Sequence, residues 1–226
     1  MRISIITIFP EMFDSYFANS IIKRAKEKEK VTIDFVDPRE FADNPRQVDD
    51  YLFGGSPGML LKIEPIVRAL ESIKTADSYV VLTSANGHPF KQEKAIDLST
   101  KKHLIIICGR YEGVDGRIVN FLDEEISIGD YVLTGGELAA MIISDSIIRL
   151  LDNVINHKSL NSESYNNNLL EGYHYTRPVE FLGYEVPEVL LSGHHKNIEK
   201  YRLSESEKIT QARRPDLYKK YLNEKE

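Results

Sequence analysis

Three glycine-rich clusters are the segments of this chain whose residue types and spacing point most directly to chemistry. They are Tyr51–Met59 (YLFGGSPGM), Cys108–Gly113 (CGRYEG) and Ile128–Glu137 (IGDYVLTGGE). Glycine lets the backbone approach a ligand closely or adopt a positive φ. Because the clusters follow predicted strands or long loops, together they indicate a ligand site at the carboxyl ends of strands. The residue pattern alone indicates a small-molecule site and leaves its ligand open.

The sequence lacks the motifs of several well-known binding and catalytic sites. The chain has no G-x-G-x-x-G dinucleotide motif, no P-loop and no H-E-x-x-H zinc motif. Its six histidines show no metal-ligand spacing, so we expect no metal site. No G-x-S-x-G of a serine hydrolase is present. The single cysteine, Cys108, ends an apolar run, and we expect it to be a packed core residue rather than a nucleophile.

The elements that position these clusters alternate along the first part of the chain. Apolar or β-branched runs of strand length are separated by segments with helical spacing or charged helix formers. This alternation predicts an α/β unit with a mainly parallel sheet. A strongly apolar helix, expected to be buried, follows at Glu137–Leu151. The predicted strands are Ile3–Phe9, Val31–Val36, Tyr79–Thr83 and Leu104–Cys108, and the predicted helices between them are Asn19–Glu29, Glu64–Ala76 and Phe90–Leu98.

Composition narrows the class of protein. The 226 residues are 42% apolar and 28% charged, with a net charge of −6, which excludes a globally basic nucleic-acid binder. One cysteine excludes a disulfide framework. The longest apolar run, Leu104–Cys108, is far too short to cross a membrane, and the N-terminus lacks the features of a signal peptide. We therefore expect a soluble cytoplasmic protein.

The composition and the apolar pattern of the sequence change at Asp152. Residues 156–168 (NHKSLNSESYNNN) are polar and without an apolar period, which is typical of a linker or mobile loop. Helices are predicted further on, at Asn197–Gln211 and Pro215–Leu222. These features divide the chain into an α/β domain (1–155), a flexible linker (156–171) and a small helical domain (172–226).

Seven sequence blocks follow one another along the chain. They are IFPEMF (8–13), VDD with GGSPGM (48–59), CGRYEG (108–113), SIGDYVLTGGEL (127–138), HYTRP (174–178), SGHH (192–195) and RRPD (213–216). Taken in order, these blocks resemble those of the bacterial tRNA (guanine-N1)-methyltransferases of the SPOUT class. The resemblance covers essentially the whole chain, and SIGDYVLTGGEL is its most specific part.

The resemblance implies a fold and a cofactor site. It implies that the α/β domain contains a deep trefoil knot, against the usual rule that chains do not knot. It also implies that the knot loops bind S-adenosylmethionine, so that 1–155 is the cofactor-binding domain and 172–226 the tRNA-binding domain. The cofactor-binding residues carried over are Leu82, Thr83, Ser84, Ala85, Gly109, Tyr111, Glu112, Gly113, Ser127, Ile128, Gly129, Asp130, Tyr131, Val132, Leu133, Gly135 and Gly136.

The chemistry of guanine methylation defines two further needs. Neutral N1 of guanine carries a proton and is a poor nucleophile, so a carboxylate base near N1 and a cation near O6 would assist transfer. By resemblance, the cation is Arg149, and the base falls on Glu163 in the linker, where the family usually has aspartate. Ser56, Ala85 and His88 also depart from the usual family residues.

Because the chain as a whole is acidic, RNA binding must depend on a local excess of positive charge. Residues 1–171 hold 19 basic and 26 acidic residues, whereas residues 172–226 hold 10 and 9, and Lys196–Arg214 holds 6 and 3. Such cations contact phosphates and place the RNA without reading its sequence. The residues expected to hold the tRNA are Arg177, His194, Lys196, Arg213 and Arg214, and the resemblance adds Asp49 and Pro57 near the target base.

The resemblance implies methylation of guanosine at tRNA position 37 by a homodimer. The cofactor site of one subunit would meet the linker and C-terminal domain of the other. An enzyme of the same class that acts on ribosomal RNA is the nearest alternative, and HYTRP and SGHH disfavour it. A catalytically silent RNA- or cofactor-binding protein is a second alternative, which only Glu163 in place of aspartate suggests.

Overall fold

The chain forms two compact units, Met1–Ile155 and Asn156–Glu226, in a computed structural model that describes residues 1–156 and 163–225. Part of the predicted linker, residues 157–162, lies outside the described residues. Within the described ranges, no helix combines the length and apolar character needed to cross a membrane.

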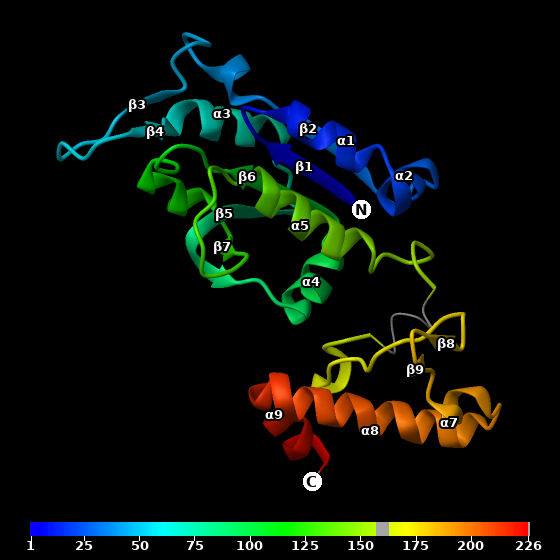
Figure 1. Cartoon of the computed structure of the whole chain (residues 1–226). Coiled ribbons are helices and arrows are strands. Elements are labelled where there is room, and N and C mark those ends of the chain that lie inside the picture. The colour runs from blue at the N-terminus through cyan, green and yellow to red at the C-terminus, as the bar shows by residue number, and fades with distance from the viewer. Residues whose placement is uncertain (157–162, 226) are drawn as a thin grey trace. The chain divides into compact units, whose positions relative to one another are not determined.

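A five-stranded parallel sheet forms the centre of the first unit (Figure 1). Its order is β2-β1-β6-β5-β7, and every neighbouring pair is parallel. All six residues of β6 are buried, because this strand lies between β1 and β5 under helices on both faces. The predicted α/β architecture with a parallel sheet is confirmed. The strands are β1 (Arg2–Ile6), β2 (Thr32–Val36), β5 (Ser78–Pro89), β6 (His103–Cys108) and β7 (Glu124–Ser127).

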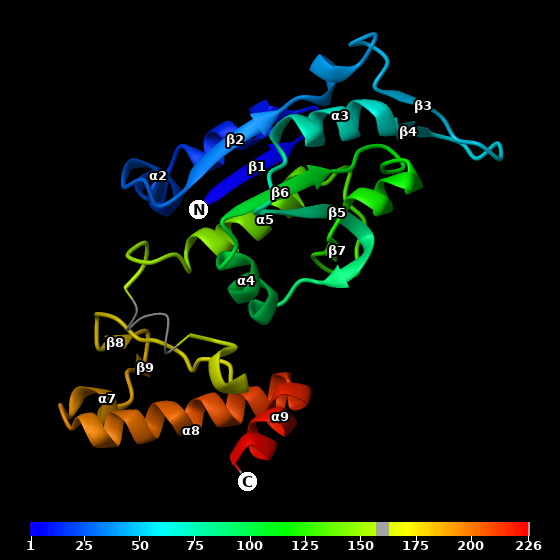
Figure 2. The same cartoon turned by 180° about the vertical axis from the view of Figure 1, so that it is seen from behind.

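The sheet separates two apolar cores, as alternation along the strands requires. Leu104, Ile106 and Cys108 belong to one core, and Ile105 and Ile107 belong to the other. The first core also receives α2 (Ser20–Glu27), α4 (Gln92–Ser99) and α5 (Glu137–Ile148), and α5 crosses in front of the sheet in Figure 1. The second core receives α3 (Ile63–Ile73). Figure 2 shows the molecule from behind, with α3 on the face toward the viewer.

Short elements complete the first unit. They include a two-stranded antiparallel sheet of β3 (Asp49–Tyr51) and β4 (Met59–Leu61), which the sequence patterns did not predict. The remaining helical turns are η1 (Pro10–Phe13), α1 (Asp14–Phe17), η2 (Pro38–Phe41) and η3 (Gly116–Phe121).

β5 is longer than predicted and irregular. The strand expected at Tyr79–Thr83 continues to Pro89, with a register shift in which Thr83 and His88 both lie opposite Ile126. The shift leaves residues 84–87 as an insertion in the pairing with β7, and such insertions are common next to functional sites. Gly87 fits here because a Cβ would lie 2.5 Å from the backbone nitrogen of Ile126.

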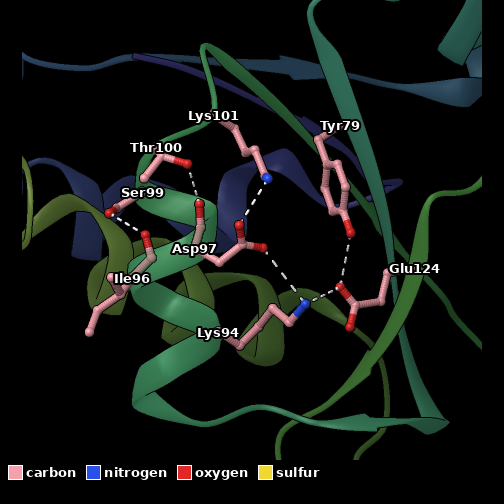
Figure 3. A network of polar contacts seen from close by, with 8 residues as sticks. All are labelled: Tyr79, Lys94, Ile96, Asp97, Ser99, Thr100, Lys101 and Glu124. Carbon is pink, nitrogen blue, oxygen red and sulfur yellow. Dashed lines mark hydrogen bonds and ion pairs between the residues drawn. The ribbon is translucent and has the colours of Figure 1, made fainter.

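A polar network fastens α4 to the edge of the sheet (Figure 3). Lys94 Nζ lies 2.9 Å from the Oε2 of Glu124, and the Tyr79 hydroxyl donates to the same oxygen at 3.2 Å. Lys101, just beyond the C-terminal end of α4, pairs with Asp97 of that helix at 2.9 Å. Glu124 is the first residue of β7, and its side chain is only 11% exposed. The network therefore holds the strand that leads into the third glycine cluster.

The second unit is helical with one small sheet. It contains η4 (Asn166–Asn168), β8 (Glu180–Phe181), β9 (Tyr184–Glu185), α7 (Glu188–Leu191), α8 (His195–Arg213) and α9 (Pro215–Lys225). The predicted helices at Asn197–Gln211 and Pro215–Leu222 are confirmed, and each is slightly longer. The hydroxyl of Tyr221 on α9 donates to Glu207 on α8 at 2.6 Å, and Lys225 pairs with the same carboxylate.

A buried histidine joins three strands at the edge of the sheet opposite their carboxyl ends. His103 is 5% exposed, with Ser4 Oγ 2.8 Å from Nε2 and Ser78 Oγ 2.8 Å from Nδ1. Ser4 Oγ also donates to Asp34 at 2.8 Å. Burial, reinforced by the positive charge of Arg2 and only partly opposed by Asp34, lowers the pKa of His103. The neutral ring is therefore the form that the fold stabilises.

We expect the free energy of unfolding to decrease as the pH falls below the ordinary histidine pKa of about 6.5. The unfolded chain takes up the proton at His103 more readily than the folded one, so acidification favours unfolding. Denaturant titrations between pH 7.5 and 5 check this. The His103→Asn variant should show a flatter dependence, whereas His88→Asn, at an exposed site, should keep the wild-type slope. Equal slopes for wild type and His103→Asn would contradict the assignment.

Candidate functional site

A cavity of about 500 Å³ lies at the carboxyl ends of β5, β6 and β7. Its volume is in the usual range for small-molecule sites. All but one of the residues predicted to bind a cofactor line it, because parallel strands bring the segments that follow them to one edge of the sheet. The lining residues from the prediction are Leu82–Ala85, Gly109, Tyr111–Gly113, Ser127–Gly129, Tyr131–Leu133, Gly135 and Gly136.

Asp130 is the exception, since it does not line the cavity although its neighbours do. The structure also adds lining residues to the predicted set. Asn86 and Arg110 lie within or beside the predicted loops, and adjacency was the only signal for them. Val114 and the η3 residues Gly116, Ile118 and Val119 carry no motif, so only the fold reveals them. Glu125, Ile126 and Ala139 complete the lining.

Close backbone packing joins the loops that line the cavity. The amide of Gly136 donates to the carbonyl of Gly109 at 2.8 Å. A Cβ at Gly136 would lie 2.0 Å from Thr83 Oγ1, 2.9 Å from the Cα of Cys108 and 2.9 Å from the nitrogen of Gly109. Glycine is therefore required for these segments to meet. Cys108 itself is 2% exposed, and burial raises its thiol pKa well above the usual range, which confirms it as a core residue.

The β3–β4 hairpin is attached to the same wall of the cavity. The amide of Leu61 donates to the carbonyl of Gly113 at 3.1 Å, and the amide of Glu112 donates to that of Met59 at 3.0 Å. Two predicted RNA-binding residues lie on this hairpin. Asp49 is in β3 opposite Leu61, and Pro57 is exposed in the connecting turn. The hairpin thus connects these positions to the segment Gly109–Gly113.

Charge at the cavity is unbalanced toward negative. Among its lining residues, Glu112 and Glu125 are acidic, and the single basic residue is Arg110. Arg110 is already neutralised by an ion pair with Glu137, with Nε 3.2 Å from Oε2. The arrangement is therefore suited to a cationic ligand bound largely by backbone groups.

The two predicted catalytic residues do not line this cavity. Arg149 is the half-buried residue that directly follows Ile148, the last residue of α5, in the first unit. Glu163 is half-buried and belongs to the second unit.

The predicted RNA-binding cations of the second unit lie at its surface. Arg177, His194, Lys196 and Arg213 are exposed, and Arg214 is half-buried. His194 and Lys196 are at the N-terminal end of α8, and Arg213 and Arg214 are at its C-terminal end. The two groups are therefore separated by about 27 Å of helix.

Two of these cations have partners within the unit. Arg214 pairs with Asp216 at 2.6 Å, and its guanidinium lowers the pKa of that carboxyl to about 2. Arg213 donates to the Tyr173 hydroxyl and lies over the same ring, 5.6 Å from its centroid. The charge that Arg214 offers to a phosphate is reduced by its carboxylate partner.

A larger cavity, of about 870 Å³, lies wholly within the second unit. Tyr173, Tyr175, Arg177, Tyr201 and Arg202 are among its lining residues. None of the glycine clusters contributes to it, so we assign the ligand site to the smaller cavity of the first unit.

Gly136→Ala should destabilise the protein by about 1–3 kcal/mol, because the new methyl group must displace two backbone atoms. Chemical denaturation measures the change. Gly116→Ala is the matched control, since a Cβ at Gly116 would meet nothing within 4 Å. Similar stability losses in the two variants would contradict the close packing at Gly136.

Comparison with known proteins agrees with this architecture. The family model described as tRNA (Guanine-1)-methyltransferase TrmD matches residues 1–220. A Ureaplasma urealyticum protein is 53% identical over the full length of both chains. A Borreliella burgdorferi protein is 48% identical, covering 98% of this chain and 95% of its own. Both carry the name tRNA (guanine-N(1)-)-methyltransferase. The chain therefore belongs to the tRNA (guanine-1)-methyltransferase family.

Proposed function

We propose that this protein transfers a methyl group from S-adenosylmethionine to N1 of guanosine at position 37 of tRNA. One observation carries the proposal: nearly all residues expected to bind the cofactor line one cavity at the carboxyl edge of the parallel sheet. The names of the relatives, which specify guanine N1 of tRNA, support the substrate class. Such a reaction belongs in the cytoplasm, where tRNA is modified.

The cavity fits the proposed cofactor in charge and in construction. Glu112 and Glu125 favour a cation, and glycines at 109, 113, 135 and 136 allow close backbone approach. When bound, S-adenosylmethionine supplies an electrophilic methyl group on a positively charged sulfur. We infer that the three loops lining this cavity also form the deep trefoil knot expected from the resemblance. Their tight packing at Gly136 supports this inference.

Glu163 and Arg149 are proposed to carry the proton and charge changes at the guanine. The Glu163 carboxylate would accept the N1 proton, which would leave the N1 lone pair free to bond to the methyl carbon as the carbon–sulfur bond breaks and the neutral thioether leaves. The Arg149 guanidinium stabilises the negative charge that develops on O6. Sequence correspondence supports both roles. Glutamate and aspartate have similar ordinary pKa values, so the replacement preserves a base of comparable strength.

We further propose a homodimer in which the active site forms between subunits. The apolar helix at this position was expected to be buried, but Leu138 and Ile142 of α5 are 49% and 45% exposed. They lie four residues apart on one face of α5. Met12 and Tyr16, on segments that adjoin α5, are also exposed. Partial burial and the nearby Asp145 of α5 raise the pKa of Tyr16, which reflects how close these segments lie to α5. An exposed apolar face of this kind suits a second copy of the chain.

In the proposed complex, cations of the second unit hold the tRNA backbone. Arg177, His194, Lys196, Arg213 and Arg214 would contact phosphates. Asp49 and Pro57 would lie near the target base, and their position on a hairpin attached to Glu112 and Gly113 supports that role.

Wild-type enzyme should transfer labelled methyl from S-adenosylmethionine to a tRNA transcript with guanosine at positions 36 and 37, and not to one lacking guanosine 37. Glu163→Gln should slow single-turnover transfer by about 100-fold or more, because N1 keeps its proton. Saturating cofactor and tRNA separate this effect from binding. Glu180→Gln, at an exposed site in the same unit, is the control. Unchanged turnover in Glu163→Gln would reject Glu163 as the base, and no transfer by wild type would reject the function.

Subunit mixing tests the shared site. Arg149→Ala and Glu163→Gln should each be nearly inactive alone. If each site takes Arg149 from one subunit and Glu163 from the other, exchanged heterodimers contain one intact site, and a statistical mixture regains about a quarter of wild-type activity. Absence of any recovery after verified exchange would contradict a site formed between subunits.

Charge reversal at Arg213 and Arg214 (both to Glu) should weaken tRNA binding and reduce its salt dependence, because phosphate contacts release counterions. Asp216→Asn should have the opposite effect, since it frees Arg214 from its partner. Affinities measured between 50 and 300 mM salt check both variants. Wild-type affinity and salt slope in the charge-reversed variant would contradict the role of this pair.

A further inference from the structure

Glu137, the first residue of α5, is a carboxylate buried where the proposed cofactor loops meet. It is 1% exposed, and burying a charged group is costly unless it is paired. The Thr7 hydroxyl donates to Oε1 at 3.0 Å. Oε2 accepts no hydrogen bond from the part of the chain that the structure describes. Arg110 Nε donates to Oε1 at 3.4 Å and lies 3.2 Å from Oε2 as an ion pair. The carboxylate therefore depends on Arg110 for charge compensation.

Arg110 lines the cavity, but its nitrogens are committed to the protein. Nε faces Glu137, Nη1 donates to the carbonyl of Thr134 at 3.1 Å, and Nη2 contacts Met12 Sδ at 3.2 Å. The guanidinium also lies over the Phe9 ring, 4.5 Å from its centroid. An arginine in a glycine-rich loop often binds an anionic group of a ligand. Arg110 instead holds segments of the protein together.

The pair lies directly beneath one of the cavity glycines. A Cβ at Gly135 would be 2.5 Å from both Arg110 Nε and Glu137 Oε2. Gly135 and Arg110 are also bridge partners. Through Thr7, the pair reaches the end of β1, so it links three segments: the chain after β1, the loop after β6 and the loop after β7.

We propose that Glu137 and Arg110 are positioning residues that hold the loops at 109–113 and 134–136 in their ligand-binding shape before the ligand arrives. Neither residue is a catalytic group. The inference rests on the proposed cofactor site for its functional consequence. Preformed loops bind without a further ordering cost, so loss of the pair lowers cofactor affinity. Removing one partner leaves the other as an uncompensated buried charge, which disturbs both loops at once.

Hydrogen exchange on the cofactor-free, full-length protein tests the positioning role directly. Glu137→Gln should accelerate amide exchange in peptides covering 109–113 and 134–136, and leave the core strand β6 unchanged. Glu93→Gln is the matched control, because Glu93 is an exposed glutamate in the first turn of α4. It reproduces the loss of a favourable helix-dipole charge without the buried pair. Wild-type exchange in both loops of Glu137→Gln would overturn the inference.

Calorimetric titration with S-adenosylmethionine tests the consequence. Glu137→Gln should weaken binding by about tenfold or more, with the KM for tRNA unchanged at saturating cofactor. Equal cofactor affinity in wild type and a folded Glu137→Gln variant would overturn the functional part. A wild-type protein that binds no S-adenosylmethionine would instead reject the proposed cofactor, and the exchange experiment would still decide the positioning role.

Thr7 supplies a milder test in case Glu137→Gln fails to fold. Thr7→Val removes the hydroxyl at similar volume, and Thr7→Ser keeps it. Weaker cofactor binding and faster loop exchange in Thr7→Val, with near wild-type values in Thr7→Ser, support the inference. Identical behaviour of the two variants would contradict it.

Discussion

Parallel pairing of β5, β6 and β7 brings three strand ends to one edge of the sheet, and the cavity depends on that constraint. Each strand end is followed by a segment without regular pairing, and these segments can meet only because Gly136 has no side chain. The polar network of Lys94, Glu124 and Tyr79 keeps the edge strand β7 in register with β5. The sheet, the helix α4 and the loops that follow the strands therefore together determine the shape of this cavity.

The sequence predicted best where one physical effect dominated. β6 was predicted because five of its six residues, Leu104–Cys108, form a continuous apolar run, as is typical of a buried parallel strand. β7 was missed because Glu124 and Glu125 precede its single isoleucine, and the charge of Glu124 is compensated by Lys94, thirty residues away. The β3–β4 hairpin was missed because Asp49 and Asp50 are poor strand formers, and its pairing is supported by the loop at 110–113.

The candidate site divides in the same way. Two of the three glycine clusters supply about half of the cavity lining, and the first cluster, Tyr51–Met59, supplies none of it. Ile118 and Val119 line the cavity only because of the path of η3. The helix predicted at Glu137–Leu151 was expected to be buried, and this expectation was wrong at Leu138 and Ile142, which are exposed. An apolar helix pattern does not distinguish a core from a surface that awaits a partner. No sequence pattern distinguishes Glu137 from any other acidic residue at the start of a helix, and only the fold shows its burial beside Arg110.

The long helix α8 has a consequence for substrate choice, given the proposed role of its cations. His194 and Lys196 are separated from Arg213 and Arg214 by about 27 Å, which corresponds to about eight phosphates along one strand of a duplex. Neighbouring phosphates of one strand cannot reach both ends of the helix together. The spacing of the cations on the helix would then favour RNAs in which two remote backbone phosphates lie about 27 Å apart. A folded RNA holds two distant phosphates at a fixed separation, whereas a flexible single strand must lose conformational entropy to hold them there, so the proposed contacts would favour a preformed RNA shape over an unfolded strand.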